Sequence, residues 1–228
     1  MKRKRLLIVE PHSDDSIIAA GGFLLKYRDD FDIHFCLVCA SDLNMYHGKV
    51  SREIRLSEYQ AYVDYFSGTW VKPRHNNLEL PVDLESNLDT LSKSLLVKLI
   101  ENAIHEVMPD VLMFMGPSFH HDHTLVYESV IAATRPTFSW APLQLFVLEN
   151  PTYVHDPYPV SFTANTYVEL DEKIITMKCE LFEKFFPSQI RPSGNYLSKQ
   201  GLKKWAQYRG IEARCDFAEA FSQYFSRI

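Results

Sequence analysis

The sequence predicts an α/β fold in which helices cover both faces of a mostly parallel β-sheet. Short apolar runs alternate along the chain with longer segments that repeat apolar residues at helical spacing. The short runs are continuously apolar, which is typical of strands that are buried on both faces. The chain has 228 residues, 46% of them hydrophobic, and shows no internal repeat or linker. We therefore expect a single domain over residues 1–228.

The expected elements follow one another in strand–helix order. Strands are predicted at 5–10, 32–39, 70–72, 110–116, 143–149 and 165–170. Helices are predicted at 16–29, 51–67, 88–107, 123–134, 171–185, 198–209 and 215–226. Right-handed crossovers between such strands build a Rossmann-like sheet. The pair Gly21-Gly22 lacks the G-x-G-x-x-G pattern of a dinucleotide site, so we expect it to pack the first helix closely on the sheet.

Composition and charge exclude several function classes. The formal net charge is −5 and no basic stripe occurs, which argues against a nucleic-acid partner. No segment approaches the about 18 apolar residues that a membrane span needs. The basic start, Met1 to Arg5, is followed by too short an apolar run for a signal peptide, so we expect a cytoplasmic protein.

Cys36 and Cys39 have the C-x-x-C spacing of redox and metal sites. They lie in an apolar run that reads as a strand, and residues three apart on a strand point to opposite faces. We therefore expect two buried packing residues rather than a reactive pair.

Residues 11–15, Pro-His-Ser-Asp-Asp, form the turn between the first strand and the first helix. Two adjacent carboxylates repel each other, and a turn does not require them. His12 and Asp15 are three residues apart and can face one point. In an open parallel sheet, turns at the carboxyl ends of the strands hold the ligand sites. This turn is therefore a candidate site.

A second cluster, His120, His121, Asp122 and His123, follows the strand at 110–116. Because both clusters follow strands of one sheet, they can meet in space. His12 and Asp15, with one of the three histidines, would supply the two imidazoles and one carboxylate of a catalytic zinc. Asp14 would remain beside the metal as a general base, and the positive charge of the metal would offset the carboxylate repulsion.

A simpler interpretation exists for each cluster alone. Asp14 or Ser16 could serve only as the N-cap of the first helix, and the three histidines could be polar surface residues. Two clusters with complementary ligands at equivalent positions of the sheet favour the metal site.

The segments PHSDDSIIAAGG and HHDH resemble the PIG-L/LmbE-like family of zinc-dependent N-acetylglucosamine de-N-acetylases, whose pattern is Pro-His-x-Asp-Asp followed by His-x-Asp-His. The resemblance covers nearly the whole chain. Arg55 and Glu58 match an Arg-x-x-Glu helix of the family, and Lys178, Ser188-Gln189 and the AEAF segment at 218–221 match its C-terminal part. Ser13, Ser16 and His121 depart from the common pattern.

The resemblance implies a role for each of these residues. It assigns the metal to His12, Asp15 and His123, the general base to Asp14, and oxyanion stabilisation or amine protonation to His120. It implies that Asp122 orients a histidine without binding the metal itself. The implied metal is Zn²⁺, with another divalent metal as an alternative. For Arg55 and Glu58, a role near the substrate and an exposed helix ion pair both stay open.

The expected reaction is hydrolysis of the N-acetyl group of an N-acetylated amino sugar or glycoconjugate, giving a free amine and acetate. Hydrolysis of another small amide conjugate is one alternative, and a metal-bound binding module without turnover is another. A free carboxylate at Asp14 favours an enzyme, since a pure binding site does not need it. Loop 150–164, an ordered loop or lid, and residue Tyr196 offer candidates for a sugar-stacking wall, namely Tyr153, His155, Tyr158 and Tyr196.

Overall fold

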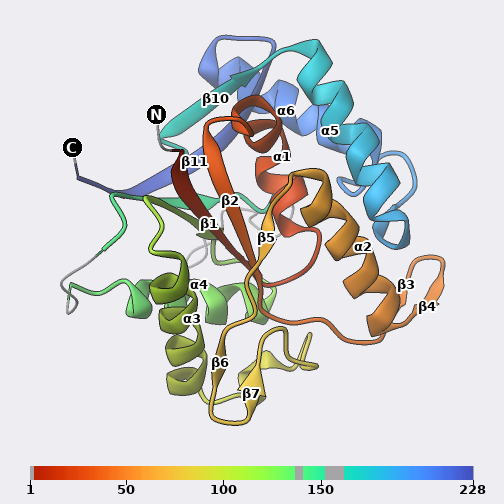
Figure 1. Cartoon of the computed structure of the whole chain (residues 1–228). Helices are drawn as coiled ribbons and strands as arrows, with labels where there is room; N and C mark the ends of the chain where they lie inside the picture. The colour runs from red at the N-terminus through yellow and green to blue at the C-terminus, as the bar shows by residue number, and fades with distance from the viewer. Residues whose placement is uncertain (1–2, 137–140, 152–161, 228) are drawn as a thin grey trace.

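The computed structural model of the chain describes residues 3–136, 141–151 and 162–227. A seven-stranded sheet with the order β10-β11-β9-β8-β1-β2-β5 runs through its centre (Figure 1). Its strands are β1 (Lys4–Glu10), β2 (Phe31–Leu37), β5 (Thr69–Trp70), β8 (Val111–Met115), β9 (Gln144–Leu148), β10 (Thr166–Leu170) and β11 (Phe217–Ser226). Among the described strands of this sheet, β11 alone runs antiparallel to its neighbours. The mostly parallel sheet predicted from the sequence is therefore confirmed.

Helices cover both faces of this sheet, as predicted (Figure 1). One layer holds α1 (Asp15–Tyr27), α2 (Arg52–Tyr65), α5 (Glu172–Phe185) and α6 (Lys199–Ala213). The other layer holds α3 (Lys93–Val107) and α4 (His121–Ala133). Two short hairpins lie outside the main sheet, β3 (Leu43–Met45) with β4 (Gly48–Val50) and β6 (Arg74–His75) with β7 (Leu78–Glu79), and two 3₁₀ turns, η1 (Leu88–Thr90) and η2 (Pro187–Gln189), complete the order.

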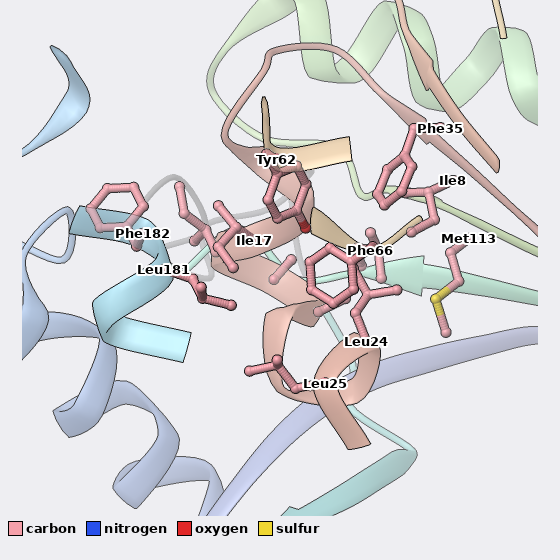
Figure 2. Packing of buried hydrophobic residues seen from close by; sticks show 14 of the residues in the cluster. Ile8, Ile17, Leu24, Leu25, Phe35, Tyr62, Phe66, Met113, Leu181 and Phe182 are labelled. Atoms are coloured by element: carbon pink, nitrogen blue, oxygen red, sulfur yellow. The ribbon is translucent and has the colours of Figure 1, made fainter. Parts of the chain in front are cut away.

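The apolar runs form strands because each strand is buried on both faces. Along β1, Leu6 and Ile8 pack into one hydrophobic cluster, whereas Leu7 and Val9 pack into the other. Figure 2 shows the first cluster, in which Phe35 of β2 and Met113 of β8 join the side of the sheet that Tyr62 of α2 covers. Burial of this kind is the main favourable contribution to folding.

One predicted element is wrong: within the helix predicted at 215–226, residues Phe217–Ser226 form the strand β11 instead. Phe217, Ala218 and Phe221 repeat at a spacing that also fits a helical face. In the structure, this segment pairs antiparallel with both β9 and β10. Tertiary pairing here outweighs local propensity, as is common for strands. The other predicted elements are present with small shifts of their ends, except that residues 88–92 contribute η1 and only the rest of 88–107 forms α3.

The prediction that the glycine pair brings α1 close to the sheet is confirmed at Gly22. A Cβ atom there would lie 2.4 Å from Leu170 Cδ1 of β10. Close by, the buried carboxylate of Glu219 on β11 accepts the main-chain N–H of Gly22 at 2.7 Å and the ammonium of Lys178 at 2.7 Å. Lys178 also donates to the carbonyl of Ile18 at 2.6 Å. These contacts fix α1 against the last strand.

Cys36 and Cys39 are buried and free, as expected. The expected reason was wrong, however. Because β2 ends at Leu37, strand alternation does not extend to Cys39, and both cysteines pack into the same hydrophobic cluster.

The strand order reverses beside β1. From β1 the chain continues through α1 to β2 on one side and reaches β8, on the other side of β1, only later. In α/β sheets, ligands bind at such a reversal, beyond the carboxyl ends of the strands. None of the helices in the described parts of the chain combines the length and apolarity that crossing a membrane requires.

Candidate active site

The turns that follow β1 and β8 lie next to each other at the carboxyl edge of the sheet. The two strands pair in parallel with Val9 opposite Phe114, so the segments after them begin at neighbouring positions. A cavity of about 300 Å³ opens at this edge, and six of the predicted site residues line it: His12, Asp14, Asp15, Arg55, His120 and His123. This volume is at the lower end of the about 300–1,000 Å³ that small-molecule sites occupy.

His12, Asp15 and His123 point their donor atoms at one another. His123 Nε2 lies 3.1 Å from His12 Nδ1 and 3.5 Å from Asp15 Oδ1. His12 Nδ1 lies 3.7 Å from Asp15 Oδ2. A tetrahedral zinc ion with bonds of about 2.0–2.1 Å separates its ligand atoms by about 3.3 Å. The donor atoms and their spacing therefore fit a divalent metal.

Asp122 contacts the ring nitrogen of His12 that faces away from Asp15 and His123. Its carboxylate is fully buried and lies 3.0 Å from His12 Nε2, the nitrogen that faces away from Asp15 and His123. Asp122 also accepts the main-chain N–H groups of Ser86 at 2.8 Å and Leu88 at 3.3 Å, which fix its position. A carboxylate on the outer nitrogen of a histidine leaves the inner nitrogen as the metal donor.

Asn150 contacts the outer ring nitrogen of His123, as Asp122 contacts that of His12. It follows β9, and its side-chain amide lies 3.3 Å from His123 Nδ1. Among the described residues, its Oδ1 has no hydrogen-bond partner. Turning the terminal amide by half a rotation brings Oδ1 onto the Nδ1–H of His123 and leaves Nε2 as a free donor atom for the metal.

The buried carboxylates of the cluster favour a nearby positive charge. Burial raises the pKa of Asp15 to about 7, against a lowering by His12 and with a further rise from Asp14. Burial lowers the pKa of His12, but the hydrogen bonds with Asp122 and Cys39 and the nearby negative charges together outweigh this, so the pKa of His12 lies well above its usual value. Without a metal, His12 therefore carries a proton that partly compensates the carboxylates. A bound divalent cation would displace this proton and supply the charge itself.

As far as the structure describes the chain, the side chain of Asp14 does not cap the helix that follows it. Asp14 occupies the N-cap position of α1, but its side chain makes no capping hydrogen bond there among the described residues. Ser16 lies inside α1, so the N-cap interpretation is wrong for Ser16, whereas Asp14 holds the N-cap position without a capping side-chain bond to the described residues. Burial also raises the pKa of Asp14, while His12 and Arg55 lower it. A cavity-lining carboxylate of this kind suits proton transfer.

His120 and His121 differ in environment although they are adjacent. The ring of His120 lies edge-on to that of His12 with 4.5 Å between centroids, and it lines the cavity. Burial, together with the charge of His12, lowers the pKa of His120 to about 4, so this imidazole is neutral at neutral pH. His121 is more than half exposed and lies 3.0 Å from the carbonyl of Ser86. The surface interpretation therefore fits His121 but is wrong for the buried His123.

The interpretation of Arg55 and Glu58 as an exposed helix ion pair is wrong. Arg55 is 1% exposed, lines the cavity and forms a two-pronged ion pair with Glu85, with Nη2 2.8 Å from Oε1. Glu58 instead accepts hydrogen bonds from the main chain of Ser188 at 3.1 Å and from its hydroxyl at 2.6 Å. The first residue shapes the cavity and the second fixes η2.

Glu85→Gln is expected to destabilise the fold by about 3 kcal/mol, because it leaves the guanidinium of Arg55 buried without its countercharge. This is the lower end of the range for a broken buried pair, because the charge of Asp14 also acts on Arg55. Urea unfolding measures the change. The control is Glu128→Gln, which breaks the half-exposed pair with Lys93 and is expected to cost less than about 1 kcal/mol. Equal losses would show that the Arg55–Glu85 pair is not effectively buried.

Several lining residues did not emerge from the sequence as site residues: Asn44, Glu85, Asn150 and Arg191, with Gln189 noted there only as part of the resemblance. Asn150 had a usable signal, since it stands just past the end of a predicted strand. Tyr196, a candidate for sugar stacking, also lines the cavity. The other candidates, Tyr153, His155 and Tyr158, lie outside the described residues.

Comparisons with known proteins agree with this geometry. The family model PIG-L, described as GlcNAc-PI de-N-acetylase, matches residues 7–134. The fold is similar to that of the N,N′-diacetylchitobiose deacetylase from Pyrococcus horikoshii, at 18% identity and a TM-score of 0.70 over 96% of this chain and 83% of that one. It is similar to teicoplanin deacetylase Orf2 in a zinc-inhibited form, at 15% identity and a TM-score of 0.67 over 96% and 98%.

The same fold also occurs in a protein with a different reaction. GalB, the 4-carboxy-2-hydroxymuconate hydratase from Pseudomonas putida KT2440, matches at 16% identity and a TM-score of 0.69 over 99% of this chain and 98% of that one. The curated proteins contain no match. The matched segment contains both turns that form the cluster and more than half of the chain, and on this basis the protein belongs to the PIG-L family.

Proposed function

We propose that this protein is a metal-dependent de-N-acetylase that hydrolyses the acetamide of an N-acetylated amino sugar or glycoconjugate. One observation carries the proposal: two imidazoles and a carboxylate converge at a cavity that is also lined by a second carboxylate, Asp14, which makes no capping bond among the described residues. We further propose zinc as the metal, His12, Asp15 and His123 as its ligands, and residues 1–228 as one deacetylase domain.

When bound, the metal would polarise the amide carbonyl and lower the pKa of the attacking water to about 7. Asp14 accepts a proton from that water as its oxygen bonds to the carbonyl carbon. His120, neutral in this environment, donates an N–H hydrogen bond to the oxyanion that forms. The C–N bond then breaks, the nitrogen takes up the proton held by Asp14, and acetate and a free amine leave. Asp122 and Asn150 hold the two imidazoles in place throughout.

The test is a screen for acetate release from free, nucleotide-linked and lipid-linked N-acetylated sugars. Release of acetate in equal amounts with free amine is expected from at least one of them. Other small amide conjugates are included, with release of the free amine as the readout, and turnover confined to them would favour the alternative substrate class. Tight metal binding without turnover of any amide would favour a binding module and contradict the proposal.

His120→Ala is expected to lower kcat by about 10²–10³-fold while the metal content stays unchanged, because the residue stabilises charge only in the transition state. Steady-state kinetics and elemental analysis on the same preparation measure the two effects. The matched control is His121→Ala, which removes the neighbouring imidazole outside the cavity and is expected to stay near the wild-type values. Loss of metal from His120→Ala would make His120 a ligand.

A further inference from the structure

The cavity has a second set of lining residues that the proposed reaction does not use. Gln189 ends η2 and Arg191 lies two residues beyond it, and both face the cavity together with Leu43, Asn44 and Met45 of the β3–β4 hairpin. The hairpin lies beside this segment, as the distance of 3.9 Å between Arg191 Nη2 and Met45 Sδ shows. These residues belong to elements other than those that carry the metal cluster.

Two polar side chains of this set, Gln189 and Arg191, have buried donor atoms without an acceptor among the described residues. Gln189 is 4% exposed, and its Nε2 has no hydrogen-bond partner among the described residues. In the same described part of the chain, Nη1 of Arg191 is buried and has no partner either. An unpaired buried donor is unfavourable, and such groups in native proteins call for an explanation. A ligand that brings acceptor oxygens into the cavity would satisfy both.

The charge of Arg191 is also uncompensated. The other guanidinium in the cavity, Arg55, is paired with Glu85. Arg191, by contrast, forms no ion pair with any residue that the structure describes. Its side chain contacts the sulfur of Met45 and lies 5.8 Å from the centre of the Tyr46 ring. A thioether is a weak acceptor and an aromatic face carries no net charge. Neither neutralises the guanidinium.

A guanidinium can only donate hydrogen bonds, and its planar fork matches a carboxylate or phosphate. We propose that Arg191, assisted by the Gln189 amide, binds an anionic group on the substituent attached to the amino sugar. The small cavity favours a compact acidic substituent. This proposal rests on the proposed function, because it takes the sugar acetamide to lie at the metal cluster.

The test compares anionic substrates with neutral counterparts, and the carboxylate and its carboxamide differ almost only in charge. The probes are the N-acetylglucosaminide of glycolic acid, its neutral carboxamide, N-acetylglucosamine 1-phosphate and methyl N-acetylglucosaminide. Charge-assisted hydrogen bonds predict a kcat/KM about 10- to 100-fold higher for an anionic probe than for its neutral counterpart, mainly through KM. The carboxylate and phosphate arms separate the two sources of negative charge.

Arg191→Gln is expected to remove this preference while the neutral probes keep their kcat. Arg191→Lys, which keeps the charge without the fork, is expected to retain part of it. The control, Lys49→Gln, removes one positive charge from the exposed face of the same hairpin, where Lys49 pairs with Asp42, and is expected to leave the preference intact. Circular dichroism shows that each variant is folded.

Equal kcat/KM for charged and neutral probes, or an equal loss on both in Arg191→Gln, would overturn the anion site and leave the deacetylase proposal standing. If no probe releases acetate, the wider substrate screen decides the deacetylase proposal, and calorimetric binding of the same probes decides the second question. Binding that depends on the negative charge and is lost in Arg191→Gln would support the anion site. Binding without charge preference would refute it.

Discussion

Asp14→Asn is expected to keep its metal and to lose turnover by about 10²–10⁴-fold, the usual effect of removing a general base. Asparagine has nearly the shape of aspartate, but it is uncharged and a poor proton acceptor. Because the Asp14 side chain makes no capping bond to α1, the substitution leaves the helix start in place. Elemental analysis and kcat, measured on one preparation, test the prediction.

The neighbouring variant Asp15→Asn supplies the matched comparison. Asp15 Oδ2 accepts the main-chain N–H of His12 at 2.8 Å, and the amide oxygen of asparagine can keep that bond. The variant therefore loses the negative charge while its local backbone contact is preserved. It is expected to bind metal weakly and to recover part of its activity when zinc is added, whereas Asp14→Asn is not rescued. If it is Asp14→Asn that loses the metal, the roles of base and ligand are exchanged.

Exhaustive chelation is expected to abolish activity while the fold persists. Without the metal, a protonated His12 lies between the carboxylates of Asp15 and Asp122, so the cluster keeps a compensating charge. Two hydrophobic clusters on the two faces of the sheet supply stability independent of the ion. Acetate release and circular dichroism, before and after chelation, measure the two effects.

Restoration by zinc controls for damage during chelation. Full activity in a preparation that elemental analysis shows to be metal-free would rule out the proposed mechanism. Unfolding on chelation would instead show that the ion is part of the structural core, as in small zinc domains.

The meeting of the two clusters could be predicted because it depends on topology alone. His12 and His123 follow strands that are apolar throughout, and such strands lie side by side in a parallel sheet whose carboxyl ends share one edge. The order of the strands is therefore enough to predict that the residues of the two turns are neighbours. The structure places their side chains within hydrogen-bonding distance.

The partners of these residues could not be predicted in the same way. Glu85 and Arg191 come from irregular segments without periodicity, and their positions depend on how loops pack after the sheet has formed. The sequence paired Arg55 with Glu58 because they are one helical turn apart. Burial instead turns Arg55 toward Glu85, thirty residues further along the chain.

The strand β11 shows the same limit for the fold. Its segment 217–221 contains alanine and glutamate, which favour helices in isolation, and a strand was not expected there. Its position between β9 and β10 supplies main-chain partners on both sides that a helix would leave unused. Such nonlocal pairing is invisible to a local pattern.

The position of β11 between β9 and β10 also determines when these two strands can pair with it during synthesis on the ribosome. Its two neighbours, β9 and β10, leave the ribosome earlier and are not paired with each other in the final sheet. Until Phe217–Ser226 has been made, both present open edges, which are prone to wrong pairing. Glu219 arrives with the same strand and binds the main chain of α1, the helix that begins at Asp15. The helix that carries a proposed metal ligand therefore gains this contact only after β11 has been made.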